Sequence, residues 1–153
     1  YNFISREKFE YMIKNHMLLE YNVYVGNYYG TPKQPVLDAS KNGDDIIIEV
    51  DVNGAARIRK KLPQAISIFI MPPSFEELGR RLSGRGTETK EVIAERMNSA
   101  LSEIERATEY DYIVVNDDID TAVNDIMQII SGSRLMLKRQ KHIIKEVLNY
   151  VKS

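Results

Sequence analysis

The chain has 153 residues, of which 43% are hydrophobic and 28% are charged, as is typical of a globular protein with a core of useful size. A formal net charge of -1 argues against a general polyanion binder such as a non-specific nucleic-acid-binding protein, and no run approaches the ~18 apolar residues of a membrane span. The absence of cysteine excludes disulfides and thiolate metal sites, and it agrees with a cytoplasmic location.

The first part of the chain predicts a small α+β unit. Residues Glu7 to Asn15 have the pattern of a short helix. Residues Tyr21 to Tyr29 alternate in polarity and are rich in aromatic side chains, as antiparallel strands are. We expect this part to be an insertion beside the main sheet rather than a continuation of it.

Three short apolar runs predict buried strands of a parallel sheet, namely Ile46 to Val52, Ile66 to Ile70 and Tyr112 to Val115. Helical patterns lie between or after these runs, at Asn53 to Lys61, Ser74 to Ser83, Glu91 to Arg106 and Ile119 to Ile130. Strands that alternate with helices predict β-α-β units, so the expected fold class is α/β.

The end of the chain predicts an amphipathic helix from Arg134 to Val151. Its apolar positions are Leu137, Ile143, Ile144, Val147, Leu148 and Val151. Because an apolar stripe favours burial, we expect this helix to pack on the core.

Three arginines occupy a predicted helix–loop–helix element. Arg96 lies within the apolar stripe of its helix, Arg81 borders the apolar edge of the preceding helix, and Arg85 lies between two glycines in the turn. Guanidinium groups keep their charge and bind phosphate oxygens in a bidentate way, so this placement indicates a multiply anionic ligand. The alternative is a solvated arginine run or an ion pair, for instance between Arg96 and Glu103.

Two carboxylates stand at the end of the first predicted strand of the sheet. Glu49 and Asp51 are two positions apart, so they share one face of a strand. Ligands of open α/β sheets bind at the carboxyl ends of the strands, where carboxylates can hold Mg²⁺ directly or through water, or orient phosphate-binding groups. The alternative is an ordinary strand end that emerges into solvent.

Five short segments follow one another in an informative order. They are Glu20, Gly26 to Thr31, Ile46 to Gly54, Gly84 to Thr89 and Val114 to Asp118. In this order they resemble a bacterial-type guanylate kinase, a nucleoside monophosphate kinase of the P-loop class, over the chain up to about Arg134. One such segment would be weak evidence, whereas five in order are specific. The resemblance implies a parallel sheet with a small α+β GMP-binding insertion and a helical lid.

The resemblance also implies how the chain is divided. Residues 1–35 would form the GMP-binding subdomain, residues 36–73 and 108–153 parts of the core, and residues 74–107 the lid with its connecting helices. None of the eight glycines is followed by lysine, so the family's phosphate loop is expected before Tyr1 in the natural protein. Without that loop we expect the 153-residue polypeptide to be inactive.

The implied reaction is ATP + GMP to ADP + GDP with Mg²⁺ as cofactor. Guanine presents two N–H donors on one edge, which the carboxylate of Glu20 can accept together, while the hydroxyl of Thr31 can donate to its acceptors. The hydroxyls of Tyr1 and Tyr29 would hold the GMP phosphate, and Asp51 could reach Mg²⁺ through water. The residues implied in GMP binding are Tyr1, Glu20, Tyr29, Thr31, Glu49 and Asp51.

The implied catalytic residues are the three arginines of the lid. Arg81 and Arg85 would contact the phosphates of ATP, and Arg96 would reach the phosphoryl group in flight. Asn116 would lie near the adenine of ATP. As a bare Asn-Asp-Asp sequence, however, this segment also predicts an Asx turn that caps the next helix.

A second function of a different class is open to this fold. Guanylate-kinase-like domains of membrane-associated scaffold proteins bind phosphopeptides and have lost the phosphate loop. The lid arginines together with Glu20, Thr31 and Asp51 oppose that function here. We therefore expect GMP and ATP as the ligands, neither nucleic acid nor membrane as a partner, and either a monomer or a homodimer.

Overall fold

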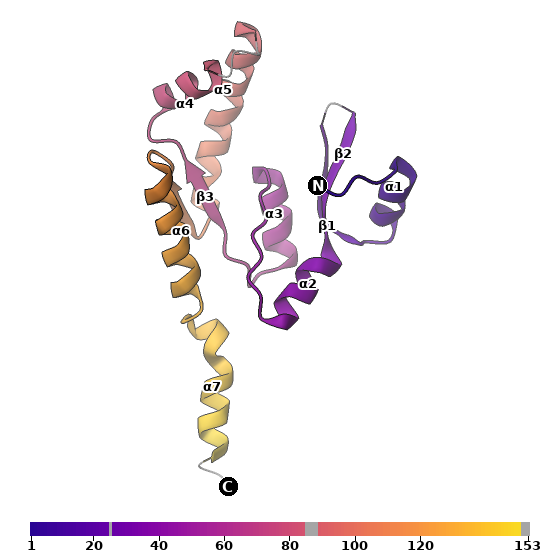
Figure 1. Ribbon diagram of the computed structural model, residues 1–153, viewed down its shortest axis with the longest axis vertical. Coiled ribbons are helices and arrows are strands. Elements are labelled where there is room, and N and C mark those ends of the chain that lie inside the picture. The colour runs from indigo at the N-terminus through magenta and orange to yellow at the C-terminus, as the bar shows by residue number, and fades with distance from the viewer. Residues whose placement is uncertain (25, 85–88, 151–153) are drawn as a thin grey trace. The chain divides into compact units, whose positions relative to one another are not determined.

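The computed structural model describes residues 1–24, 26–84 and 89–150. The chain forms two compact units, Tyr1–Ala65 and Ile66–Ser153 (Figure 1). In the part of the chain that is described, the first unit contains an antiparallel strand pair and the second a parallel pair. Mixed α/β structure with parallel strands was expected, and it is confirmed.

The first unit is built around a β-hairpin. Strands β1 (Leu18–Tyr24) and β2 (Asn27–Pro32) pair antiparallel, and Glu20 lies opposite Thr31. Gly26 in the turn has a φ of 76°, in the left-handed region that glycine adopts without steric cost. The predicted antiparallel strands are therefore confirmed.

Three helices accompany the hairpin: α1 (Arg6–Lys14), α2 (Lys33–Asn42) and α3 (Val52–Lys61). The first and third were predicted, whereas α2 was not. Helix α2 follows Pro32, which has no side-chain cap bond, and it ends at Gly43 with a φ of 80°. Val36 is the only buried residue of this helix, so its apolar stripe is too narrow for hydrophobic periodicity to predict a helix here.

The core of the first unit lies between the hairpin and its helices. Leu19 of β1 is fully buried, and Val36 of α2 and Ile58 of α3 pack against it. Three half-buried side chains extend this cluster, namely Ile48, Val50 and Leu62. Helix α3 is thus fixed against β1. The same packing places the N-terminal end of α3 so that it faces the hairpin.

The predicted strand from Ile46 to Val52 is wrong. Residues 44–51 have no regular structure, and no described strand pairs with them. Ile47 is 78% exposed, and the chain turns into α3 because the side chain of Asp51 accepts the N–H of Gly54 at 2.7 Å. A strand is stable only when its backbone groups are paired, and apolar content alone did not report that.

The second unit contains the parallel strands β3 (Ile68–Met71) and β4 (Tyr112–Val115), with Ile70 opposite Val114. The connection between them is helical. It consists of α4 (Phe75–Ser83), α5 (Lys90–Glu105) and a short 3₁₀ turn (Arg106–Glu109). Both strands and both helices were predicted, and they form the expected β-α-β arrangement.

Hydrogen bonds between Ser67 and Asp111 support the register of the two parallel strands. The Oδ2 atom of Asp111 accepts the N–H of Ser67 at 2.8 Å and its hydroxyl at 2.7 Å. In return the N–H of Asp111 donates to the Oγ atom of Ser67 at 3.1 Å. These bonds join the residues just before β3 and β4, and the first residues of the two strands, Ile68 and Tyr112, lie opposite each other.

The chain ends in two helices, α6 (Ile119–Ser133) and α7 (Leu137–Tyr150). Both were predicted, but the expected packing of the last helix on the core is wrong. None of the described residues of α7 is buried, and Leu137 is 66% exposed. The amphipathic pattern specified the helix but not a surface that would cover its apolar face. No described helix is both long and apolar enough to cross a membrane.

Candidate functional site

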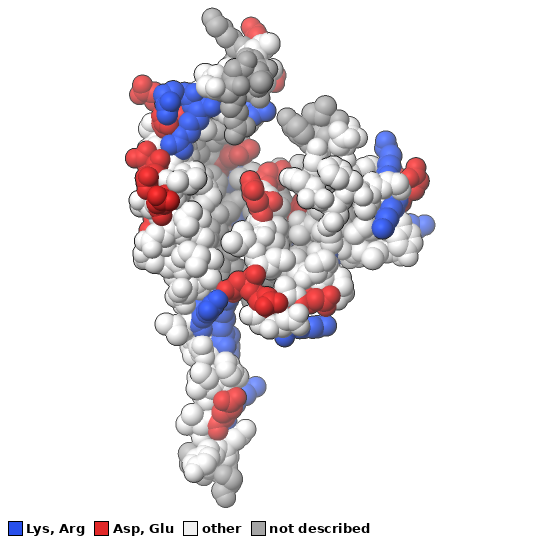
Figure 2. Space-filling model, in the orientation of Figure 1, with Lys and Arg blue, Asp and Glu red and all other residues white. Residues whose placement is uncertain are grey.

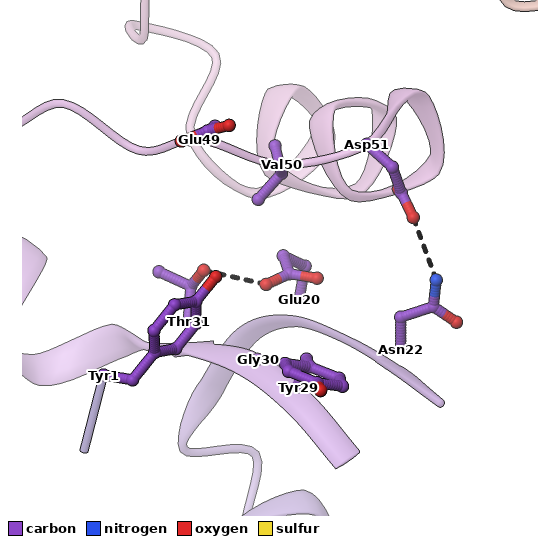
Figure 3. A pocket seen from close by; sticks show the side chains of 9 residues that line it. All are labelled: Tyr1, Glu20, Asn22, Tyr29, Gly30, Thr31, Glu49, Val50 and Asp51. Carbon is purple, nitrogen blue, oxygen red and sulfur yellow. Dashed lines mark hydrogen bonds between the residues drawn. The ribbon is translucent and has the colours of Figure 1, made fainter. Parts of the chain in front are cut away.

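A cavity of about 310 Å³ lies in the first unit, beside the hairpin (Figure 3). Its volume is at the lower end of the range for small-molecule sites. The lining residues are Tyr1, Glu20, Asn22, Tyr29, Gly30, Thr31, Glu49, Val50 and Asp51. All six residues that the sequence placed at one GMP site are among them, although they come from four separate stretches of the chain.

Glu20 is the most buried acidic group of the cavity. It lies on β1 with 7% of its surface exposed, and its Oε1 atom accepts the hydroxyl of Thr31 on β2 at 2.8 Å. The hairpin register places the two residues opposite each other. A carboxylate has about four lone-pair sites, so this single bond leaves acceptor capacity for a ligand.

Two tyrosines stand at the side of the cavity where the chain begins. The rings of Tyr1 and Tyr29 meet edge to face, with centroids 6.4 Å apart and an angle of 78° between their planes. Tyr29 is 44% exposed, so its hydroxyl is accessible. Tyr28, one position earlier, stacks instead on Phe9 of α1 at 5.1 Å. Tyr28 is therefore a packing residue of the first unit, while Tyr29 lines the cavity.

Asp51 faces the hairpin from the start of α3. Its Oδ1 atom accepts the N–H of Gly54, and its Oδ2 atom accepts the side-chain amide of Asn22 at 2.9 Å (Figure 3). The sequence analysis missed Asn22. A signal was present, because Asn22 follows Glu20 by two positions, and residues two apart on a strand share a face.

Two glycines allow the close approach of the walls. A Cβ atom at Gly54 would lie 2.9 Å from the Cβ of Val50 and 3.3 Å from the Oε2 atom of Glu20. A Cβ atom at Gly30 would lie 2.8 Å from the carbonyl oxygen of Glu20. A larger residue at either position would therefore have to displace the backbone or the core that supports Glu20.

The cationic residues at the end of α3 hold β1 in place. The guanidinium of Arg57 donates to the carbonyl of Tyr21, and the ammonium of Lys61 donates to the carbonyl of Leu18 at 3.0 Å. Arg57 and Lys61 thus connect the strand that carries Glu20 to the helix that Asp51 caps.

The second unit brings together two residues that the sequence assigned to ATP. Arg81 of α4 donates from Nη1 to the carbonyl of Asn116 at 2.7 Å and from Nη2 to the carbonyl of Asp117 at 3.4 Å. Its Nε atom donates to Glu77 at 2.6 Å, in an ion pair one turn away on the same helix. Arg81 is therefore only partly exposed and held at three points.

Glu77 also binds the neighbouring Arg80 at 2.6 Å, although the side chain of Arg80 is 75% exposed. Hydrogen bonds from Arg80 and then from Arg81 lower the pKa of Glu77 to about 2. Figure 2 shows acidic and basic side chains next to each other over α4. The carboxylate thus stays ionised at any ordinary pH.

The remaining predicted residues of the second unit have different positions. Arg96 on α5 is half-buried, as its place in the apolar stripe suggested, whereas Arg85 lies outside the described residues. The cap of α6 is Asp118, whose Oδ1 atom accepts the N–H of Thr121 at 2.8 Å, and not Asn116. The backbone N–H of Asn116 instead extends the pairing of β4 by donating to Met71 at 2.8 Å.

Among the described residues no group of three or more His, Asp or Glu side chains is placed to hold a metal ion. The two oxygens of Asp51 already accept N–H donors. A Mg²⁺ ion beside Asp51 would therefore be reached through water.

The chain thus combines an α/β unit that contains a parallel strand pair with a hairpin unit that contains an acidic cavity, the kind of concave site that suits a small molecule. The guanylate kinase family model matches residues 1–133. The chain belongs to the guanylate kinase family.

Individual relatives agree with the family match. The chain is 45% identical to a guanylate kinase of Neisseria gonorrhoeae over 148 residues, which is 97% of this chain and 72% of that protein. It is 50% identical to a guanylate kinase of Halalkalibacterium halodurans over 145 residues, or 95% of this chain and 70% of the relative. A crystal structure of guanylate kinase from Anaplasma phagocytophilum superposes with a TM-score of 0.75 at 31% identity, covering 91% of this chain and 68% of that one.

Proposed function

We propose that the protein is a guanylate kinase that transfers the γ-phosphoryl group of ATP to GMP, giving GDP and ADP. Curated relatives that carry the name of the enzyme support this function over phosphopeptide binding. The observation that carries the proposal is the buried carboxylate of Glu20 beside the hydroxyl of Thr31 in a cavity of suitable size.

Glu20 and Thr31 recognise the guanine base in this proposal. Guanine presents N1–H and N2–H₂ on one edge, and a carboxylate accepts both. The hydroxyl of Thr31 donates to Glu20 in the ligand-free structure. When guanine replaces that interaction, the hydroxyl can rotate and donate to an acceptor of the base. Glu20 and Thr31 together therefore recognise both the donors and the acceptors of guanine.

The hydroxyls of Tyr1 and Tyr29 hold the phosphate of GMP. The residues that line the cavity include three carboxylates and no lysine, arginine or histidine. Neutral donors can bind a phosphate without forming an ion pair with those carboxylates. Glu49 and Asp51 complete the acidic wall, and Asp51 would hold a water molecule of Mg²⁺ when the ion is bound with ATP. The ion would supply neutralisation of the charge on the transferred phosphoryl group.

The arginines of the second unit act on the phosphates. Arg81 and Arg85 bind the ATP phosphates, and Arg96 stabilises the phosphoryl group in flight, as parts of a lid formed by α4 and α5. The bond from Arg81 to the carbonyl of Asn116 supports a common role for these two residues at ATP. We place the enzyme in the cytoplasm, acting on free nucleotides.

The guanine assignment is tested by the choice between GMP and AMP. Adenine has an acceptor at N1 and lacks the 2-amino group, so Glu20 would face a lone pair instead of two donors. An unpaired buried charged group costs more than the ~1–3 kcal/mol of a neutral mismatch. We expect calorimetry to show binding of GMP that is at least ~10-fold tighter than that of AMP.

The control for this measurement is the Glu20→Gln variant. Its amide presents a donor as well as an acceptor to the base, so the preference for GMP should fall. Equal affinity of the unmodified protein for both nucleotides would refute the guanine assignment.

A further inference from the structure

Asn22 fixes a carboxylate in the acidic wall of the cavity, and it has no role in nucleotide binding in the proposed function above. Asn22 on β1 donates its side-chain amide to the Oδ2 atom of Asp51 at 2.9 Å, across the cavity (Figure 3). The Oδ1 atom of Asp51 is occupied by the N–H of Gly54 at 2.7 Å. Both oxygens of the carboxylate therefore have a donor, and its rotation is fixed.

Asn22 is itself fixed in the orientation that this bond needs. Its Oδ1 atom accepts the N–H of Val23 at 2.8 Å. The amide nitrogen therefore faces Asp51, and the reverse orientation would place two acceptor oxygens against each other. The hydrogen-bond network thus determines which end of the amide faces the carboxylate.

The negative charge of the cavity explains why it matters that the side chain that donates to Asp51 is neutral. Glu20, Glu49 and Asp51 line a space of about 310 Å³. GMP brings a phosphate into this space, and a carboxylate that is free to turn could point at it and repel it. An arginine or lysine in place of Asn22 would hold Asp51 but would also compete for the phosphate. An amide holds the carboxylate without adding charge.

We propose that Asn22 is a positioning residue of the GMP site, which keeps the Asp51 carboxylate turned along the wall of the cavity. This inference rests on the proposed function, because the ligand it concerns is GMP. Asn22 acts through Asp51, and its loss affects binding of GMP more than the rate of phosphoryl transfer.

The test compares Asn22→Ala and Asn22→Asp in the full-length protein. In Asn22→Ala the Oδ2 atom of Asp51 loses its donor, and we expect the Kd and KM for GMP to rise roughly tenfold, the scale of one hydrogen bond to a charged group, with kcat within about twofold. In Asn22→Asp two carboxylates of equal shape face each other. The loss should be larger than for alanine, and raising the salt concentration should narrow the gap between the two variants.

Gln34→Ala is the matched control. Gln34 donates its side-chain amide to Asp38 at 2.8 Å on α2, in the same unit but outside the cavity lining. Its removal deletes the same kind of bond, and we expect unchanged GMP affinity. Asn22→Val provides a second variant that lacks the amide and favours a strand, so that any loss of affinity can be separated from poor folding.

Each outcome decides the proposal. Unaltered GMP affinity in both Asn22→Ala and Asn22→Val would overturn it, as would a lowered melting temperature with unchanged Kd and KM, which would make the bond merely structural. If those variants bind normally while the unmodified protein binds GMP, the inference fails and the proposed function stands. Absence of GMP binding to the unmodified protein would refute both.

Discussion

At the scale of single residues, the cavity depends on acceptors whose positions are fixed by neighbours. Glu20 receives one hydrogen bond, from Thr31, and its other oxygen would lie 3.3 Å from any Cβ atom placed at residue 54. Asp51 is held at both oxygens. Fixed carboxylates lose little entropy when a ligand binds, so this arrangement favours selective recognition of N–H donors.

Glu77 offers a prediction about pH at the same scale. Its pKa is lowered from 4.5 to about 2, first by hydrogen bonds from Arg80 and then by those from Arg81. A lowered pKa contributes stability that is fully present above about pH 4.5 and is lost as the pH falls through 2. We expect an NMR titration of the Glu77 carboxyl group to give a value near 2.

The Arg80→Ala variant is the control, because it removes the largest cause of this shift while Arg81 remains. The pKa of Glu77 should then rise toward its ordinary value. A carboxyl group that titrates near 4.5 in the unmodified protein would show that the exposed pair with Arg80 is screened by water and contributes little.

At the scale of elements, α3 is the part that organises the first unit. Its N-terminus is capped by Asp51, and Arg57 and Lys61 donate to carbonyls of β1. The core residue Ile58 lies between those two cations and packs on Leu19 of the strand. One helix therefore fixes the strand that bears Glu20 and Asn22, and the two walls of the cavity are connected through it.

Helix α5 carries the prediction for the lid. Arg96 is half-buried on this helix. A role in the transition state predicts that its removal lowers kcat, whereas a role in packing predicts that its removal lowers the melting temperature. If it stabilises the transferred phosphoryl group, Arg96→Ala in the full-length protein should lower kcat by at least ~100-fold with little change in melting temperature. Steady-state kinetics and thermal unfolding measured on the same preparation check this.

Arg80→Ala serves as the comparison in that experiment too, since Arg80 is largely exposed on the adjoining helix. It should retain a kcat close to that of the unmodified protein. If Arg96→Ala instead unfolds at a lower temperature and keeps its kcat, Arg96 is a structural residue and its catalytic assignment is wrong.

At the scale of the whole molecule, the prediction concerns the phosphate loop that binds ATP. Backbone N–H groups and the lysine of a G-x-x-x-x-G-K-[ST] loop bind the phosphates of ATP in this class. None of the chain's glycines is followed by lysine. We expect a polypeptide limited to these residues to show no turnover in a coupled ADP-release assay, whereas a protein that contains the loop should be active.

Binding of GMP to the same polypeptide gives an independent measurement, because the cavity lies wholly within residues 1–65. Normal turnover by the polypeptide would contradict the dependence on the loop. Absence of turnover in the full-length protein would contradict the proposed enzyme.

Hydrophobic periodicity and strand alternation were sufficient for most elements. They predicted β3, β4, the hairpin and all the helices except α2, because each of these carries its own local signal. The segment from Ile46 to Val52 failed as a strand since pairing depends on a neighbouring strand and not on composition. The exposed apolar face of α7 failed for the same kind of reason: amphipathicity specifies a helix but does not supply its partner.

For the candidate site, the sequence by itself determined which chemical groups are present and their order along the chain. With the resemblance to guanylate kinases, that was enough to select the six residues proposed for GMP and to propose ATP as the common ligand of Arg81 and Asn116. Only the tertiary structure decided that Asn22 bonds Asp51 and that Gly54 must lack a side chain beside Glu20. Both depend on distances of a few ångströms between segments far apart in the chain, and no local pattern encodes those distances.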